Sequence, residues 1–161
     1  MNTAANGRSA VWRRISSHNS IAKTRLGLLV LGVFLFSLLI GCAPSETVLA
    51  GEERDAVLAF SEAKTDNLLE GMNAGDYAAF SRDFDQTMLD VIAQSGFASF
   101  KQDRDAKLGL YVSRQVNRVV QGGDFYAVIY DAVFEQDDAV TVRVVFRMAE
   151  PHEVSGLWFN K

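Results

Sequence analysis

The spacing of apolar residues changes halfway along the chain, and this change restricts the fold more than any other feature of the sequence. Before residue 110, apolar side chains recur every three or four positions, as Val57, Phe60 and Ala63 do, which is the period of one helix face. After residue 110 apolar and polar residues alternate, which is typical of strands with one buried face. Helices followed by a run of antiparallel strands predict an α+β fold.

The first half of this pattern predicts three helices and one short helical turn. Acidic residues favour a helix start at Glu52, and Gly75 is a typical helix stop. The long helix covers Glu52–Ala74, and a turn capped by Asp76 follows it and holds Tyr77 and Phe80. The next helix begins after Asp83 or Asp85 and carries Met88, Leu89 and Ile92. The last helix ends at Gly109 and carries Phe97, Phe100, Arg104 and Leu108 on one stripe.

The second half predicts a curved sheet of four antiparallel strands, with the helices packed on one face. The strands are Leu110–Val120, Asp124–Glu135, Val140–Met148 and Val154–Phe159. Gly122-Gly123 predicts a two-residue hairpin turn, and apolar matching requires an odd loop around Asp137-Asp138. The predicted core contains Phe84, Phe97, Phe100, Tyr111, Phe134, Phe146 and Trp158.

A charge-free run of fifteen residues, Leu26–Ile40, stands near the start of the chain behind a basic segment. As a helix it would span about 22 Å, less than the hydrocarbon core of a bilayer, and this length is typical of an export signal. The tetrapeptide Leu39-Ile40-Gly41-Cys42 resembles the lipobox of bacterial lipoproteins. The resemblance implies a diacylglycerol on Cys42, cleavage before it, and a protein held on the outer side of a cell membrane. An uncleaved signal anchor is the alternative.

This interpretation divides the chain into a signal peptide (1–41), a lipidated cysteine with its tether (42–52) and an α+β domain (53–161). Residues 1–42 hold five of the 16 basic residues and no acid, so the rest carries 11 basic and 20 acidic residues and a net charge of −9. Such a domain disfavours nucleic-acid binding because it repels phosphates. With Cys42 as the single cysteine, an internal disulfide and a cysteine-rich zinc site are excluded.

Strand pairing across Gly122-Gly123 predicts which side chains face the helices. It places Asn117 opposite Val128 and Gln115 opposite Tyr130, with Arg114 on the other face. The inner face then has a polar patch suited to a small-molecule pocket. Its members are Tyr111, Ser113, Gln115, Asn117, Tyr126 and Tyr130. The alternative is that these groups satisfy one another or lie at a solvated edge.

The outer face of the predicted sheet is half apolar and crossed by charged residues. An exposed face of this kind suggests a partner or a homodimer. The candidate interface residues are Val116, Ile129, Val145, Arg114, Asp131 and Arg143. The alternative is that the tether of the same chain covers this face.

Several short motifs resemble a small bacterial family, the domain of unknown function 3887. They include Gly75-Asp76-Tyr77 in the helical half, and the segments 125–130 and Gly156-Leu157-Trp158-Phe159 in the sheet half. The resemblance covers about residues 53–160. It implies the cone-shaped fold shared by nuclear transport factor 2, SnoaL-like cyclases and ketosteroid isomerase, and it brings no assigned chemistry.

A catalytic set is not evident in the exported part. Asp131 is expected to point outward among arginines, which makes it a poor base, and His152 is expected in a solvated turn away from the cone. The run from Lys101 to Lys107 is interpreted as a solvated helix face, and no metal or cofactor is expected. The sequence favours a membrane-tethered, non-enzymatic small-ligand-binding or protein-interaction module. The alternative is an isomerase- or cyclase-type enzyme, or a small-molecule carrier, that uses the cone cavity.

Overall fold

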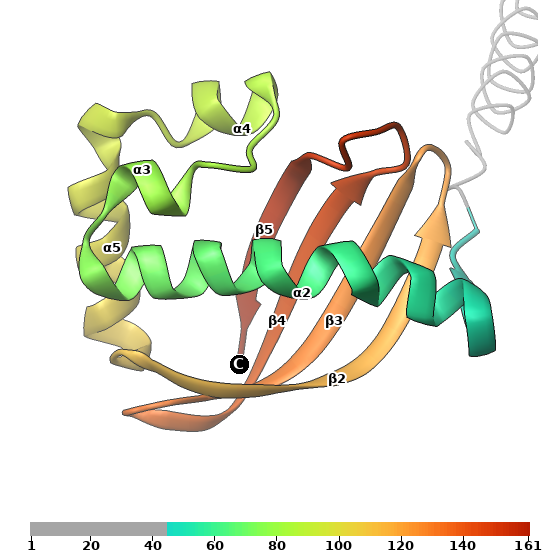
Figure 1. Cartoon of the computed structure of the whole chain (residues 1–161). Helices are drawn as coiled ribbons and strands as arrows, with labels where there is room; N and C mark the ends of the chain where they lie inside the picture. The colour runs from blue at the N-terminus through green and yellow to red at the C-terminus, as the bar shows by residue number, and fades with distance from the viewer. Residues whose placement is uncertain (1–44) are drawn as a thin grey trace, which may run out of the picture. The chain divides into compact units, whose positions relative to one another are not determined.

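Helices and sheet form two layers in the computed structural model, which describes residues 45–161 (Figure 1). The lipobox and the leader therefore lie outside the described residues. The helices are α2 (Gly51–Ala74), α3 (Tyr77–Phe80), α4 (Gln86–Val91) and α5 (Gln94–Leu108). The strands are β1 (Thr47–Val48), β2 (Tyr111–Gly122), β3 (Phe125–Phe134), β4 (Asp137–Arg147) and β5 (Val154–Asn160).

The sheet is antiparallel throughout and its strands follow one another in the order β1-β2-β3-β4-β5. The α+β plan is confirmed, but the predicted count of four strands is wrong, because β1 is a fifth. Thr47 pairs with Gln121 and Val48 with Val120, and the Leu49 amide donates to the Val119 carbonyl at 2.9 Å. Part of the segment expected to be a tether thus belongs to the sheet, and its two residues are too few to show a strand period.

The predicted helices are confirmed, together with their physical stops. α2 ends at Gly75, whose φ of 70° is the left-handed conformation that glycine adopts without strain. Asp76 caps α3 by accepting from the amides of Ala78 and Ala79. Of the two alternatives for α4, Asp85 is the N-cap, since its carboxylate accepts from the Met88 amide at 2.9 Å.

The register of β2 differs from the prediction. The hairpin turn is Gly123-Asp124, because Gly122 pairs with Phe125. This shift keeps Val119 on the inner face, which we define as the sheet face toward α2. A β-bulge at Asn117 inserts one extra residue, and a second bulge inserts another at Val112. Each odd insertion exchanges the two faces of the strand, so the faces are exchanged between the two bulges and restored at Tyr111.

The core lies between α2 and the inner face. The predicted matching of the apolar faces of β3 and β4 is confirmed, with Tyr130 opposite Val142 and Val128 opposite Val144. The expected odd loop is wrong: Phe134 pairs with Asp137 across a two-residue turn, and a register shift between Ala132 and Phe134 supplies the odd residue. Phe84, Phe97, Phe134 and Phe146 are buried as expected, and Phe100 and Tyr111 pack against the same cluster. Trp158 was predicted in this core and is instead 49% exposed. It pairs with Arg143, which is on the outer face, and its ring closely covers Gly156.

Residues 43–161 form one compact unit. Every member of the main hydrophobic cluster, from Leu49 onward, belongs to this unit. The segment 43–161 therefore holds its own core and can be studied alone. Among the described helices, none is long and apolar enough to cross a membrane.

Candidate functional site

A network of polar side chains joins α2 to β2 and β3, at the position expected for a ligand pocket. Arg114, which is 8% exposed, forms ion pairs with Glu62 and Asp66, and its Nη1 donates to the Tyr111 hydroxyl at 3.2 Å. The Tyr130 hydroxyl donates to Oε1 of Glu62 at 2.8 Å. The bulge at Asn117 explains why Arg114 faces inward, against the prediction.

Within this network, the charged partners of Arg114 compensate for the burial of its guanidinium. Burial alone would lower the pKa of Arg114, but the hydrogen bonds to Asp66 and Tyr111 and the charge of Glu62 outweigh burial and raise it above its ordinary value. Burial, together with Glu62, raises the pKa of Tyr130. The hydroxyls of Tyr111 and Tyr130 are thus hydrogen-bonded within the protein, which is the alternative that the sequence left open for the polar patch.

The other three predicted pocket residues do not join the tyrosines. Ser113 and Gln115 pair with Val133 and Asp131, on the outer face, and both are exposed. Asn117 also points outward and donates to both carboxylate oxygens of Asp131 at 2.9 and 3.1 Å. The predicted grouping is therefore wrong, because the bulge at Asn117 turns Gln115 and Ser113 outward and a second bulge at Val112 returns Tyr111 to the inner face.

The outer face also differs from its predicted arrangement. Val116 packs against the inner core, and the expected cluster of Arg114, Asp131 and Arg143 does not form. Arg143 pairs with Glu46, which precedes β1. Ile129 is only 2% exposed and packs with Val120, Ala127 and Val145. A homodimer through this face stays a prediction, and buried Ile129 offers little surface to it.

An apolar groove runs beside β5, between this strand and the helices α4 and α5. Its volume is about 390 Å³, and we call it the β5 groove. Val91 and Trp158 are exposed at its rim, although both are apolar. Among its lining residues are Met88, Val91, Ile92, Phe100, Leu157 and Trp158, with Ser155 as one of few polar groups.

A second cavity of about 270 Å³ lies farther along α5 and β5, and we call it the Arg104 pocket. Its apolar wall is Phe100, Leu108 and Phe159, and its charged groups are Asp103, Arg104, Lys107 and Lys161. Sequence reasoning placed Arg104 on the apolar stripe of its helix but interpreted the charged run around it as solvated. That interpretation is wrong for Arg104, whose side chain is 2% exposed.

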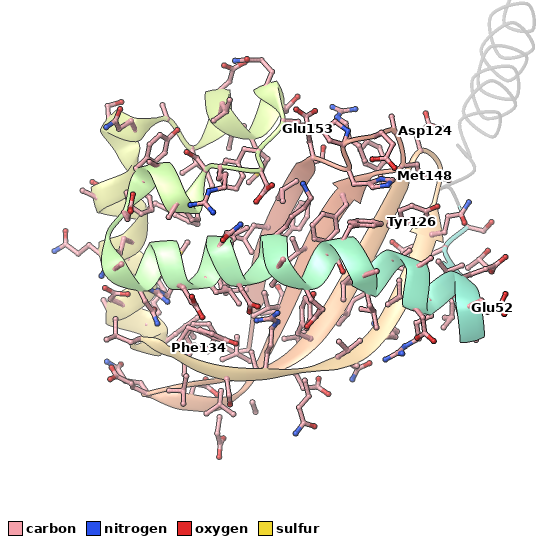
Figure 2. All side chains as sticks on the ribbon, in the orientation of Figure 1. Glu52, Asp124, Tyr126, Phe134, Met148 and Glu153 are labelled. Carbon is pink, nitrogen blue, oxygen red and sulfur yellow. The ribbon has the colours of Figure 1, made fainter. Side chains whose placement is uncertain are left out.

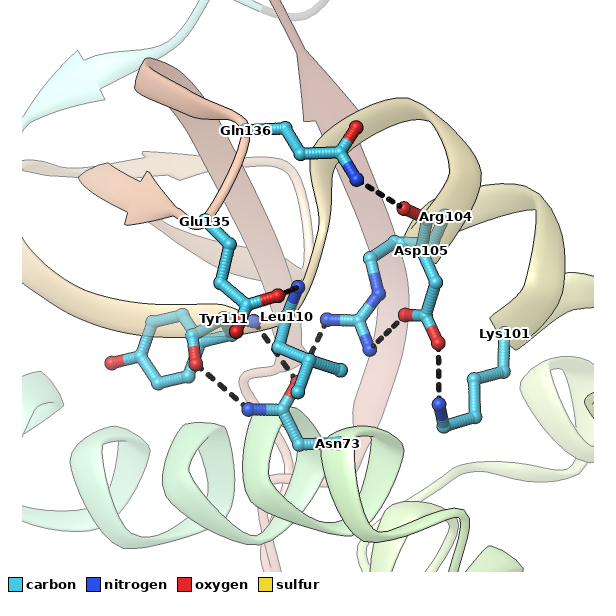
Figure 3. A network of polar contacts seen from close by, with 8 residues as sticks. All are labelled: Asn73, Lys101, Arg104, Asp105, Leu110, Tyr111, Glu135 and Gln136. Carbon is cyan, nitrogen blue, oxygen red and sulfur yellow. Dashed lines mark hydrogen bonds and ion pairs between the residues drawn. The ribbon is translucent and has the colours of Figure 1, made fainter.

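Figure 3 shows how Arg104 is held. Its Nη1 donates to Oδ1 of Asn73 at 3.0 Å, and the same Asn73 oxygen accepts from the Tyr111 amide. Its Nη2 lies 2.8 Å from Oδ1 of Asp105, in a geometry that makes no hydrogen bond. Burial lowers the pKa of Arg104 more than Asp105 raises it. This guanidinium is therefore less well compensated than that of Arg114.

A third cavity, about 300 Å³ in volume, lies at the N-terminal half of α2 and is called the His152 cleft. Tyr126 projects from the sheet toward α2 here (Figure 2), and Glu53 and Phe60 line the cleft with it. The ring of His152 stacks on Phe60, with centroids 4.0 Å apart. The expectation of a solvated turn histidine away from the cone is wrong, because the β4–β5 turn folds back over α2 and the ring of His152 packs on Phe60.

Comparison of the chain with protein-family models, curated proteins and solved structures found no match. Within residues 45–161, no group of histidine, cysteine and acidic side chains is arranged to hold a metal ion.

Proposed function

We propose that this protein is a lipid-anchored, extracytoplasmic binding protein, and that its folded domain takes a small apolar molecule in the β5 groove. The anchor is supported by the leader and by the position of the single cysteine, Cys42, at the end of the lipobox-like tetrapeptide. One acyl chain gives only marginal membrane binding, whereas the two chains of a diacylglycerol hold a protein stably.

We further propose that the domain has the cone fold of the nuclear-transport-factor-2-like proteins. The support is the arrangement of the layers, in which the long helix α2 crosses the inner face of a curved antiparallel sheet (Figure 1). In such an arrangement, space for a ligand is expected between the helices and the sheet, and the β5 groove is at one end of that boundary.

The β5 groove is the observation that carries the binding function. Ligand sites are concave, mostly apolar, of about 300–1,000 Å³, and contain few polar groups; the groove has about 390 Å³ and mostly apolar walls. In the Arg114 network, in contrast, the polar side chains bind one another rather than face a cavity. An apolar lining with Val91 and Trp158 left in water is unfavourable unless something covers it.

The anchor is tested by metabolic labelling with palmitate. The wild-type protein should carry label and fractionate with membranes, and Cys42→Ser should lose both properties. Cys42→Ser folds the same domain, since the core lies within residues 43–161, so circular dichroism of that domain serves as a control. Unlabelled wild-type protein in the cytosolic fraction would contradict the proposal.

The ligand is tested by native mass spectrometry of the domain purified from its source cell. We expect a mass above that of the polypeptide, which organic extraction removes. Leu157→Glu places a charge in the groove and should abolish the added mass, whereas Gln102→Glu on the exposed side of α5 should retain it. A bare polypeptide mass in every preparation would contradict ligand binding.

A second candidate function is an enzyme that uses the His152 cleft. His152 Nδ1 donates to the Arg147 carbonyl at 3.1 Å, and Nε2, when it carries a proton, faces the Glu150 carboxylate at 3.2 Å. A positioned imidazole beside Tyr126 could transfer protons. If so, the copurifying molecule should differ chemically between the wild type and His152→Gln, while a binding protein gives the same molecule in both.

A further inference from the structure

The β5 groove and the Arg104 pocket are consecutive stretches of one boundary between α5 and β5. Phe100 lines both cavities. On the strand, Leu157 lines the groove and Phe159 the pocket, and residues two apart share one face of a strand. We call the two cavities together the β5 trough.

The lining of the trough changes along its length from uncharged to charged. The described lining residues of the groove carry no charge, whereas Arg104, Lys107 and Lys161 face a single acid, Asp103, around the pocket. Lys161 also donates to the Lys107 carbonyl at 2.9 Å and lies 3.4 Å from Asp137. The residues that line this end thus include three cations and one acid, in a domain whose net charge is −9, while Asp105 and Asp137 pair with Arg104 and Lys161 from outside the lining.

Arg104 at the inner end of the pocket has hydrogen-bonding capacity to spare. Among the described residues, its buried Nε has no hydrogen-bond partner, and its Nη2 has only the ion pair with Asp105 at 2.8 Å. Its ion-pair partner Asp105 is shared with Lys101. Arg114 also has an unpartnered Nε, but it has two carboxylates of its own. A buried guanidinium whose single carboxylate is shared with a lysine is only partly compensated, so a second anion beside it is favourable.

We propose that the β5 trough binds a single-chain amphiphile with an anionic head, with the chain in the β5 groove and the head at Arg104. Carboxylate and phosphate heads share the required chemistry, because both accept charge-assisted hydrogen bonds from a guanidinium. The inference rests on the proposed function and adds the chemical class of the ligand. Lys107 and Lys161 attract the head from the rim, and Asn73 and Phe134 position the guanidinium.

The probes are three molecules with the same chain: dodecanoate and dodecyltrimethylammonium, each below its micelle concentration, and dodecanol below its solubility limit. Trp158 lines the groove, and because Trp12 lies in the leader, it is the single tryptophan of residues 43–161. Its fluorescence therefore reports binding directly. We expect dodecanoate to bind at least about tenfold more tightly than dodecanol, which corresponds to one charge-assisted hydrogen bond, and the ammonium probe to bind weakest. Dodecyl phosphate in place of dodecanoate identifies the preferred head.

The variants test the head and the chain separately. Arg104→Met should remove most of the preference for dodecanoate and leave dodecanol binding unchanged. Should Arg104→Met not fold, Lys107→Gln with Lys161→Gln changes only the exposed rim, and it should weaken dodecanoate binding about threefold or more and reduce its salt dependence. Asp103→Asn is the opposite change and should strengthen dodecanoate binding.

The outcomes distinguish the two proposals. Equal binding of dodecanoate and dodecanol would overturn the anionic head while the proposed apolar site stands. Tighter binding of the ammonium probe would also overturn it. A Trp158 signal that responds to none of the probes would overturn both the head and the binding function assigned to the groove.

Discussion

Arg114 and Tyr130 are held by the same carboxylate. Nη2 of Arg114 lies 3.1 Å from Oε2 of Glu62, and the Tyr130 hydroxyl donates to Oε1 of that side chain at 2.8 Å. The guanidinium also lies over the Tyr130 ring, 5.0 Å from its centroid. Through these contacts one glutamate of α2 fixes the helix against both β2 and β3, at a place where the chain buries a charge.

This arrangement predicts that removing the two acids lowers the free energy of unfolding more than removing the arginine does. Arg114 is 8% exposed, whereas the side chains of Glu62 and Asp66 are 42% and 50% exposed. Glu62→Gln with Asp66→Asn leaves a buried guanidinium without an anion and should cost about 3 kcal/mol. Arg114→Met leaves two carboxylates that water can solvate and should cost about 1 kcal/mol. Urea unfolding at neutral pH measures both free energies.

The m-value must stay unchanged for this comparison to hold. Arg54→Met with Asp55→Asn is a suitable control, since this neighbouring ion pair on the exposed part of α2 should contribute little. A larger loss for Arg114→Met than for the double acid variant would show that the carboxylates, and not the guanidinium, are the poorly solvated groups.

The hydrogen bonds that hold the Asp85 carboxylate predict that the fold loses stability in acid. Burial raises the pKa of this carboxyl, but the hydrogen bonds from the Met88 amide, Ser155 and Arg147 outweigh burial, so its folded pKa lies below the ordinary 3.8. Such a group stabilises the fold above its unfolded pKa, and this contribution is lost as the pH falls through the folded value.

The measurement is the free energy of unfolding from pH 7 down to pH 3 in the wild type and in Asp85→Asn. At pH 7 the variant should be about 1–3 kcal/mol less stable. The gap should stay constant down to about pH 5 and shrink below about pH 4. Asp138→Asn, at an exposed position in β4, should follow the wild type. A gap that widens in acid would contradict the assigned direction.

The regular elements of this fold were predictable because their signals are local. Gly75 and Asp76 punctuate the helices, and alternation of apolar residues identifies β3 and β4. β1 was missed because two residues show no period, and its pairing with β2 depends on contacts distant in sequence. The polar positions Ser61 and Thr65 of α2 are buried, which periodicity in apolar residues does not detect.

The candidate site was harder to predict because β2 has two bulges, at Asn117 and Val112. Each unpaired residue exchanges the faces of the strand, and no turn motif in the sequence marks either position. Arg104 gave a usable signal, since an arginine in line with Phe97, Phe100 and Leu108 must be buried if the stripe is. Trp158 gave none, because its half-exposed position depends on Gly156 beneath the ring.

The helices α2 and α3 approach each other closely at Gly71, which leaves no space for a larger side chain there. A Cβ added at Gly71 would lie 2.5 Å from the Phe80 amide nitrogen and 2.9 Å from the Ala79 carbonyl carbon, both of them backbone atoms that cannot rotate away. Gly71→Ala should therefore lower the free energy of unfolding by about 2–3 kcal/mol, because overpacking separates the helices.

Gly96→Ala is the matched control, since Gly96 also lies in a helix but a Cβ added there would meet open space. The better helix propensity of alanine should therefore stabilise this variant by about 0.5–1 kcal/mol. Thermal and urea unfolding of the two variants measure the difference, and equal stability of both would show that α3 can move away from α2 at little cost.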